Sequence, residues 1–256
     1  MTWVQTLEYK ANAIVGTFAI FSGLIIEFLI WRKVFHTQGI TEIRGFTFNG
    51  LMTYIFLCMI VGQLKSSWAT SIEMIDSIRT GELNKYLIRP ISFFTYHFMM
   101  FIGHNSLFYL VYGSLLILFP IFLPGWAFHT LLHIIGFIAA LIISIYLSYS
   151  IYFCMVCCAF WFGEVRALVI AYNIANSVLS GQIIPLKLFP DSVREIILIT
   201  PLPYLIDFPV SIATNNLPIN YWIPKMGLAI FWCFVITITG RIIYRYGIRV
   251  YGGFGA

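Results

Sequence analysis

The chain has 256 residues, of which 60% are hydrophobic and only 10% are charged, and its mean hydropathy is +0.90. This composition excludes an ordinary soluble globular domain and indicates a protein that spans a lipid bilayer. The net charge of +5 comes from cations that are scattered along the chain and mixed with ten acidic residues, so we expect no nucleic-acid partner.

The first predicted element is a short helix at the N-terminus, over residues 1–12. Trp3, Val4, Leu7 and Ala11 fall on one helical face, which is typical of a helix that lies in the membrane interface. The stretch has a single cation and leads into an apolar run without a small-residue cleavage site, so we do not expect a removable signal peptide.

Six apolar segments then follow that can each form a membrane span. A helix needs about 20 predominantly apolar residues to cross about 30 Å of hydrocarbon. We therefore expect an all-α polytopic membrane protein, a single transmembrane domain over residues 1–256, with spans at 13–31, 46–64, 98–123, 131–162, 167–184 and 222–243. The fourth segment is so long that it must tilt, kink or project beyond the lipid. The fifth is short and comparatively polar.

The distribution of cations predicts the orientation of these spans. Six spans place both termini on one side of the membrane, and loops rich in Lys and Arg stay in the cytoplasm. Of the 15 Lys and Arg residues, nine lie on the side of the termini and six on the other. We therefore expect cytoplasmic termini.

Polar residues inside the first two spans leave two interpretations open. Glu27 lies one turn before Trp31-Arg32-Lys33, so it either pairs with these cations at the interface or faces a polar cavity. Asn49, Thr53 and Gln63 form a loose polar stripe on the second span. Such a stripe either bonds neighbouring helices or lines a solvated pathway.

Residues 65–90 interrupt the apolar sequence with a polar stretch. Ile72, Ile75 and Ile78 recur every third residue with charged residues between them, which predicts an amphipathic helix along the cytoplasmic membrane face. Gly81 should end it, because glycine tolerates the left-handed conformation of a helix cap. A second short helix should stop at Pro90, since the residue before a proline avoids helical angles. The two helices together form either a docking site for a partner or a simple linker.

The fifth span carries a regular row of polar residues. Asn173, Asn176, Ser177 and Ser180 stand at i, i+3, i+4 and i+7, so they share one helical face. Spacing alone does not decide between contacts that bond helices together and the wall of a transport pathway.

The segment at 185–219 is rich in proline and should form several short helices on the outer side. Six of the ten prolines lie between Pro185 and Pro218. Ser192-Val-Arg-Glu195 has the pattern of a capping box, which predicts the start of one of these helices.

No enzyme motif stands out. The chain has no Gly-x-x-x-x-Gly-Lys-Ser/Thr loop, so it should bind no ATP of its own in the P-loop manner. An intramembrane enzyme would need His104, His129 or Glu27 to converge with a nucleophile or metal, and the spacing does not indicate this. A stand-alone channel or secondary transporter remains an alternative, although no chain of buried Asp, Glu and His suggests a proton relay.

Two motifs resemble those of a known family. Gly81-Glu-Leu83-Asn-Lys-Tyr-Leu87-Ile-Arg89-Pro90 matches the Gly-x-Leu-x-x-x-Leu-x-Arg-Pro signature of six-span permeases of the type-2 ATP-binding cassette (ABC) exporters. Ile184-Pro185-Leu-Lys-Leu-Phe189-Pro190, followed by Thr200-Pro201-Leu-Pro203 and Asp207-Phe208-Pro209, is similar to the segment before the last span of these permeases. The order of the motifs and the number of spans also agree over nearly the whole chain.

The resemblance implies a permease that couples ATP hydrolysis by two separate ATPase subunits to export of an amphiphilic or hydrophobic substrate. The permease would pair with a second permease, identical or homologous. ATP and Mg would bind only to the ATPase, and the permease would lie in the plasma membrane of a bacterium. Contacts with it are expected from residues 65–90, at Ile72, Glu73, Ile75, Asp76, Arg79, Gly81, Glu82, Arg89 and Pro90. The pathway is expected at Asn49, Thr53, Asn173, Asn176, Ser177 and Ser180. An outer gate is expected at Pro185, Phe189, Pro190, Pro203 and Pro209.

Overall fold

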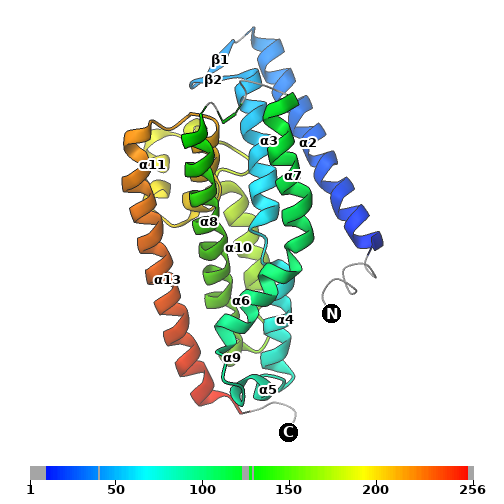
Figure 1. Cartoon of the computed structure of the whole chain (residues 1–256), viewed down its shortest axis with the longest axis vertical. Coiled ribbons are helices and arrows are strands. Elements are labelled where there is room, and N and C mark those ends of the chain that lie inside the picture. The colour runs from blue at the N-terminus through cyan, green and yellow to red at the C-terminus, as the bar shows by residue number, and fades with distance from the viewer. Residues whose placement is uncertain (1–9, 40, 123–126, 129, 253–256) are drawn as a thin grey trace.

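Long apolar helices run side by side along one axis of the computed structural model (Figure 1), which describes residues 10–39, 41–122, 127–128 and 130–252. The predicted interfacial helix at 1–12 lies almost wholly outside these residues. The first described helix, α2 (Lys10–Gln38), leads to a two-stranded hairpin at one end of the bundle, which we call the upper end. The hairpin pairs β1 (Glu42–Ile43) with β2 (Phe46–Thr47).

The hairpin turn and a helix cap start the second long helix. Arg44 and Gly45 both have positive φ, at 46° and 86°, as a tight two-residue hairpin turn requires. The Thr47 hydroxyl accepts a hydrogen bond from the Gly50 backbone N–H and caps α3 (Phe48–Leu64). After a break at residues 65–67, α4 (Trp68–Arg79) continues toward the lower end.

The chain then turns at the lower end and returns. The short α5 (Asn84–Leu87) is followed by α6 (Phe93–His104) and α7 (Ser106–Phe122), which meet at a bend of 52°. The Asn105 side chain lies at this bend and donates hydrogen bonds to the carbonyls of Ser66 at 3.0 Å and Phe101 at 3.2 Å. A side chain that bonds a backbone carbonyl of the preceding turn is a recognised cause of helix bending.

The second half of the chain provides the central helix of the bundle. α8 (Leu131–Cys157) descends between the others, α9 (Ala159–Phe162) follows at the lower end, and α10 (Arg166–Leu179) returns upward. Short helices follow at the upper end: η1 (Leu186–Leu188), α11 (Asp191–Ile199), η2 (Leu202–Leu205), α12 (Asp207–Ala213) and η3 (Ile219–Tyr221). The last helix, α13 (Trp222–Val250), runs down to the lower end.

Helices α8 and α13 pack closely because glycines remove side chains from their interface. A Cβ atom on Gly136 would lie 2.7 Å from the Trp222 ring, and one on Gly240 would lie 3.0 Å from the Phe153 ring. One on Gly247 would lie 2.2 Å from the ring of Phe160, in the adjoining α9. Small residues at such contacts let helix backbones approach each other.

The all-α polytopic architecture is confirmed at a coarser level than six spans. Among the described residues, three helices are long and apolar enough to cross a membrane, or four if the bent pair α6–α7 counts as one span. The span expected at 98–123 corresponds to the bent pair α6–α7, which already begins at Phe93 and is divided by the bend at Asn105. The long helix expected at 131–162 is present and breaks near Cys158, whereas the one expected at 167–184 already ends at Leu179.

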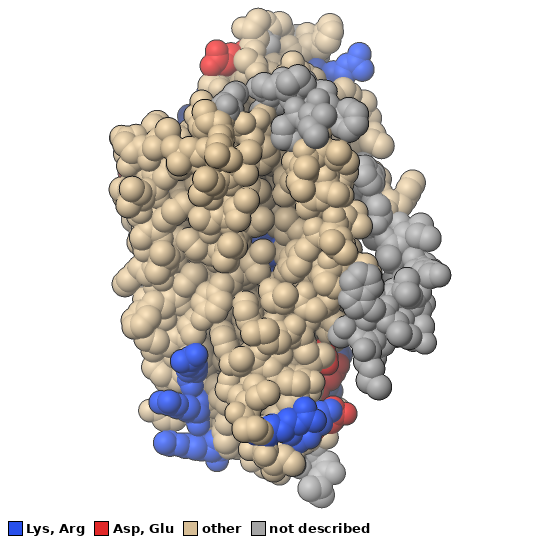
Figure 2. Space-filling view, viewed as in Figure 1, with Lys and Arg blue, Asp and Glu red and all other residues tan. Residues whose placement is uncertain are grey.

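Charged side chains lie mostly at the two ends of the bundle. In Figure 2, the face between the ends is almost free of charge, and Lys and Arg gather at the lower end, where α13 and α5 lie. Arg241, Arg245 and Arg249 follow each other at four-residue intervals on α13, and all three are exposed. This distribution matches a bundle whose middle lies in hydrocarbon.

Candidate functional site

The polar stretch at 65–90 forms a compact helical unit at the lower end. Gly81 has φ of 82° and terminates α4, as the sequence predicts, and the Leu83 N–H donates to the Ser77 carbonyl at 2.8 Å. Leu83 and Ile75 are fully buried and fix the unit to the bundle. The expectation that the first helix lies along the membrane face is wrong. The α4 helix continues the direction of α3, because its buried side packs against α8 and α6.

Two of the predicted coupling residues belong to an ion cluster within the chain. Arg166, at the start of α10, contacts Asp76 at 2.5 Å, and Arg79 contacts Glu164 at 2.5 Å. Two longer contacts close the cluster, Asp76 with Arg79 at 3.8 Å and Glu164 with Arg166 at 3.5 Å. These four side chains, the ion cluster, join α4 to the first turn of α10. Sequence reasoning missed Glu164, because nothing in the local pattern shows which long-range partner it has.

Four of the predicted coupling residues, Ile72, Glu73, Asp76 and Glu82, line a hollow of about 370 Å³ between α4 and α5. Lys85 also lines it and forms an ion pair with Glu82. Ile72 is half-buried, and Arg89 lies over the rings of Tyr86 and Tyr96 at 5.8 Å and 5.7 Å. Pro90 is exposed. The hollow thus has three acidic residues and one basic residue in its walls and lies at the charged end of the bundle.

The polar row on α10 divides into bonded and unbonded groups. Asn173 accepts a hydrogen bond from the Tyr152 hydroxyl of α8, and the Ser177 hydroxyl donates to the Ile174 carbonyl at 2.7 Å. The Asn176 side-chain oxygen and the Ser180 hydroxyl are buried and have no hydrogen-bond partner among the described residues. The row therefore bonds helices at its lower end and offers free polar groups at its upper end.

No hydrogen bond of the described residues joins the two pathway residues predicted on α3 to this row. Asn49 is exposed near the upper end of α3, and Thr53 is buried. The Thr53 hydroxyl donates to the Asn49 carbonyl at 2.9 Å within the same helix. It therefore presents no free donor to a pathway.

The upper segment is held against the bundle by buried polar contacts. The Tyr54 hydroxyl lies 2.8 Å from an Asp207 carboxylate oxygen and 3.0 Å from the Gly181 carbonyl. The Ser144 hydroxyl donates to the Leu205 carbonyl at 2.6 Å. Burial raises the pKa of Asp207 above its ordinary value, which the Tyr54 hydrogen bond partly offsets.

The five residues predicted for an outer gate lie along this upper segment. Pro185, Pro203 and Pro209 are buried, Phe189 is half-buried and Pro190 is exposed. The capping box predicted at 192–195 is wrong, because α11 already begins at Asp191 after Pro190 and has no side-chain cap. The Phe189 carbonyl accepts a hydrogen bond from Arg44 of the hairpin turn at 2.8 Å.

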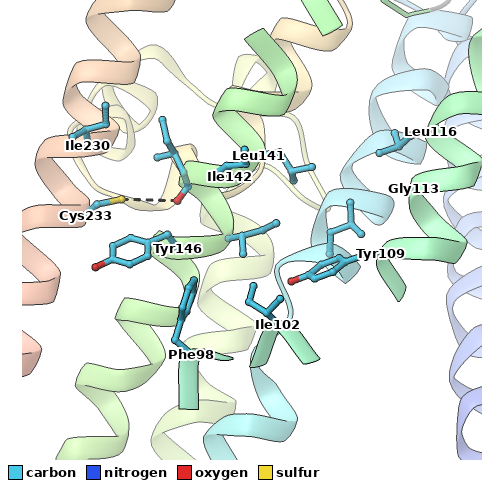
Figure 3. Close-up of a pocket in the computed structure, with 13 residues that line it drawn as sticks. Phe98, Ile102, Tyr109, Gly113, Leu116, Leu141, Ile142, Tyr146, Ile230 and Cys233 are labelled. Atoms are coloured by element: carbon cyan, nitrogen blue, oxygen red, sulfur yellow. Dashed lines mark hydrogen bonds between the residues drawn. The ribbon is translucent and has the colours of Figure 1, made fainter. Parts of the chain in front are cut away.

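An apolar cavity of about 610 Å³ lies beside the bend between α6 and α7 (Figure 3). Phe98 and Ile102 of α6, Tyr109 of α7, Tyr146 of α8 and Cys233 of α13 line it from different sides. It has the size and the lining of a site for an apolar molecule.

Two described histidines, His104 and His133, have polar partners within the bundle. His104 Nδ1 lies 3.5 Å from the Thr70 hydroxyl, and His133 lies between the Thr130 hydroxyl and the Asn215 side chain. His129 lies outside the described residues. The described residues also contain no group of three or more His, Cys, Asp or Glu side chains placed to hold a metal ion.

Comparison with known proteins identifies the family. The model of a family described as ABC-2 family transporter protein matches residues 21–255. The searches of curated proteins and of solved structures gave no match. The matched region includes the helical unit with the ion cluster, the polar row of α10 and the upper segment. The chain therefore belongs to the ABC-2 transporter family and is a permease subunit of a type-2 ABC transporter.

Proposed function

We propose that this chain is the membrane-spanning permease of an ATP-driven exporter, paired with a second permease and moved by two separate ATPase subunits. The acidic hollow between α4 and α5 carries the proposal. It lies at the charged end of the bundle, and an ATPase surface that places basic side chains in it would gain a specific, charge-complementary contact.

The ion cluster gives the ATPase a mechanical route to the transport path. A force on α4 passes through the contacts of Asp76 and Arg79 to Arg166 and Glu164, and thus to the first turn of α10. The same helix carries Asn176, whose buried side-chain oxygen has no partner among the described residues. Rotation of α10 would expose this group to a substrate, so closure of the ATPase dimer can change the polarity of the path.

We further propose that the chain crosses a bacterial plasma membrane six times, with α2 and the shorter α10 completing the set of spans. The lower end would face the cytoplasm. The cations there, among them Arg241, Arg245 and Arg249, support this orientation because positively charged segments are retained inside.

The exported substrate is proposed to be hydrophobic or amphiphilic. The cavity of about 610 Å³ beside the α6–α7 bend supports this, since its walls are almost wholly apolar. The upper segment with Pro185 and Pro203 would close the outer end of the path, held by the Tyr54–Asp207 contact.

Substitution of the acidic hollow tests the proposal. Glu73→Gln and Glu82→Gln are combined in the complex that copurifies with the tagged chain, and ATP hydrolysis is measured with and without substrate in proteoliposomes. We expect the stimulated rate to fall toward the basal rate. Glu42→Gln, on the hairpin at the opposite end, is the matched control and should leave stimulation intact. Unchanged stimulation in the double variant would refute the coupling assignment.

Accessibility of α10 tests the pathway. Single cysteines at positions 176 and 180, in a background without the five native cysteines, should react with an aqueous thiol reagent in only one nucleotide state. A cysteine at exposed Asn220 should react in every state. If positions 176 and 180 stay unreactive in all states, the polar row only bonds helices together.

The alternative of a stand-alone channel or secondary transporter needs its own experiment. Vesicles that contain this chain alone, with an imposed ion gradient, should show no uphill movement of solute. Uphill movement without an ATPase would favour a secondary transporter and overturn the exporter assignment.

A further inference from the structure

A small polar cavity lies between α2, α3 and the turn that follows α10. Its volume is about 170 Å³, and three polar side chains line it: Glu27 from α2, Gln63 from α3 and Gln182 from the turn. The segments that bring them together are far apart in the sequence. This convergence is independent of the apolar cavity beside α7, which is lined by other residues.

The polar groups of this cavity have few hydrogen-bond partners among the described residues. One carboxylate oxygen of Glu27 is buried and has no hydrogen-bond partner among the described residues. The sequence left open whether Glu27 pairs with Arg32 or Lys33, and no such ion pair is found among the described residues. The other polar side chains that line the cavity are the amides of Gln63 and Gln182. Buried polar groups in native proteins almost always have a partner in the protein, in ordered water or in a ligand, so this carboxylate oxygen has room for a water molecule or a ligand group.

The chemistry of the lining selects the bound group. Among the described residues, no Lys, Arg or His lines the cavity, so no described cation there neutralises the Glu27 carboxylate. A primary ammonium group has three N–H donors and a positive charge. Glu27 and the side-chain oxygens of Gln63 and Gln182 supply three acceptors, and the carboxylate makes its hydrogen bond charge-assisted.

The rest of the lining is suited to a carbon chain attached to that ammonium group. Leu24, Ile55, Met59 and Ile183 form apolar walls, and Ile183 is 43% exposed. The cavity itself is only large enough for a head group and its first methylenes, since one water occupies about 30 Å³ in the liquid. The remainder of a longer molecule would extend past Ile183.

We propose that Glu27, Gln63 and Gln182 bind the primary ammonium group of an amphiphilic amine. This site would narrow the substrate class of the exporter, and to that extent the inference rests on the proposed function.

Energy transfer to a fluorescent amine tests the site directly. The full chain in lipid nanodiscs is titrated with dansylcadaverine, a primary amine that accepts energy from tryptophan, and Trp31 lies one helical turn from Glu27. Its N-acetyl derivative has the same fluorophore without the charge and reports partition into lipid. The wild-type chain should bind the amine saturably and prefer it to the acetylated probe.

Two variants decide between the outcomes. Glu27→Gln keeps the shape of the side chain and should weaken binding of the amine by about tenfold or more, because hydrogen bonds to charged groups are the strong ones. Binding of the acetylated probe should not change. Glu42→Gln, an exposed acid on β1, should behave as the wild type.

Three results would overturn the proposal. The first is no saturable binding of the amine to the wild-type chain, and the second is that Glu27→Gln prefers the amine to the acetylated probe as strongly as the wild type does. The third is that Glu27→Gln weakens binding of both probes equally. A thermal melt of each variant shows whether the chain is folded, and Gln182→Ala provides a second variant that should also reduce the preference. Because the nanodiscs contain no ATPase, the site can fail while the exporter assignment stands, and the reverse also holds.

Discussion

The ion cluster predicts a measurable energetic coupling between α4 and α10. We consider Asp76→Asn, Arg166→Gln and the double variant, which remove charge without creating a new repulsion. The Asp76–Arg166 contact is 2.5 Å long, and the two side chains are 43% and 38% exposed. Pairs with this much solvent contact contribute about 0.2–1 kcal/mol, and membership in a network favours the upper end of that range.

Each single variant should therefore lower the free energy of unfolding by about 1 kcal/mol. The remaining contacts limit the loss, because Asp76 keeps Arg79 at 3.8 Å and Arg166 keeps Glu164 at 3.5 Å. In a chain of this size, about 1 kcal/mol corresponds to a melting temperature lower by about 2–4 °C. The double variant should lose less than the sum of the two single losses, since the second substitution removes a partner that is already lost.

The assay is thermal unfolding in detergent, followed by intrinsic fluorescence at low and high salt. Coupling should shrink at about 1 M salt, where the Debye length falls to about 3 Å. The Glu82–Lys85 pair at the start of α5 is the control, because its partners are three residues apart and their side chains are 56% and 46% exposed. Its coupling should not exceed about 0.5 kcal/mol. Losses that add within about 0.3 kcal/mol for Asp76 and Arg166 would refute the cluster as a link between the helices.

Three further outcomes follow from contacts described above. Gly247→Ala should lower the melting temperature, because its Cβ would lie 2.2 Å from the Phe160 ring. Gly227→Ala on the same helix is the control and should leave the melting temperature unchanged, because its Cβ would meet nothing within 4 Å. Equal melting temperatures of the two variants would contradict the close packing of α13. Tyr54→Phe should lower the free energy of unfolding by about 1–3 kcal/mol, because it removes the hydroxyl beside the buried Asp207 carboxylate. A decrease of less than about 0.5 kcal/mol in chemical unfolding would contradict this contact. The raised pKa of Asp207 means that the folded state binds this proton more tightly than the unfolded state. The contribution of Asp207 to stability is therefore present at low pH and is lost as the pH rises from the ordinary pKa of 3.8 through the raised pKa. The melting temperature should fall with rising pH over this range, and Asp207→Asn should remove that dependence.

Local patterns in the sequence predicted the helical elements well. Apolar runs bounded by charges located most long helices. A segment in hydrocarbon must be apolar along its length and must bond its own backbone as a helix, so the run itself marks the helix. Gly81 was also predicted as a helix end, because a left-handed cap needs a residue without a Cβ atom. The proline clusters correctly indicated short helices before α13.

Features that depend on distant contacts were not predictable in the same way. The bend at Asn105 is supported by a hydrogen bond to Ser66, 39 residues earlier, within a sequence that reads as one continuous apolar helix. The role of Glu164 depends on Arg79, and that of Glu27 on Gln182, which only the packed bundle places nearby. The roles in coupling and transport stay predictions, because they depend on a partner and on movement.

The close packing of α8 against α13 restricts which parts of the bundle can move. Where a glycine faces a ring, as Gly240 faces Phe153, no flexible side chain is present to absorb sliding between the helices, so the two must shift as one body. The exposed Arg241, Arg245 and Arg249 would resist displacement of that body along the membrane normal, since guanidinium groups would have to leave the lipid phosphates for hydrocarbon. The α8–α13 pair would thus stay in place during transport, and α2, α10 and the bent α6–α7 pair would move relative to it.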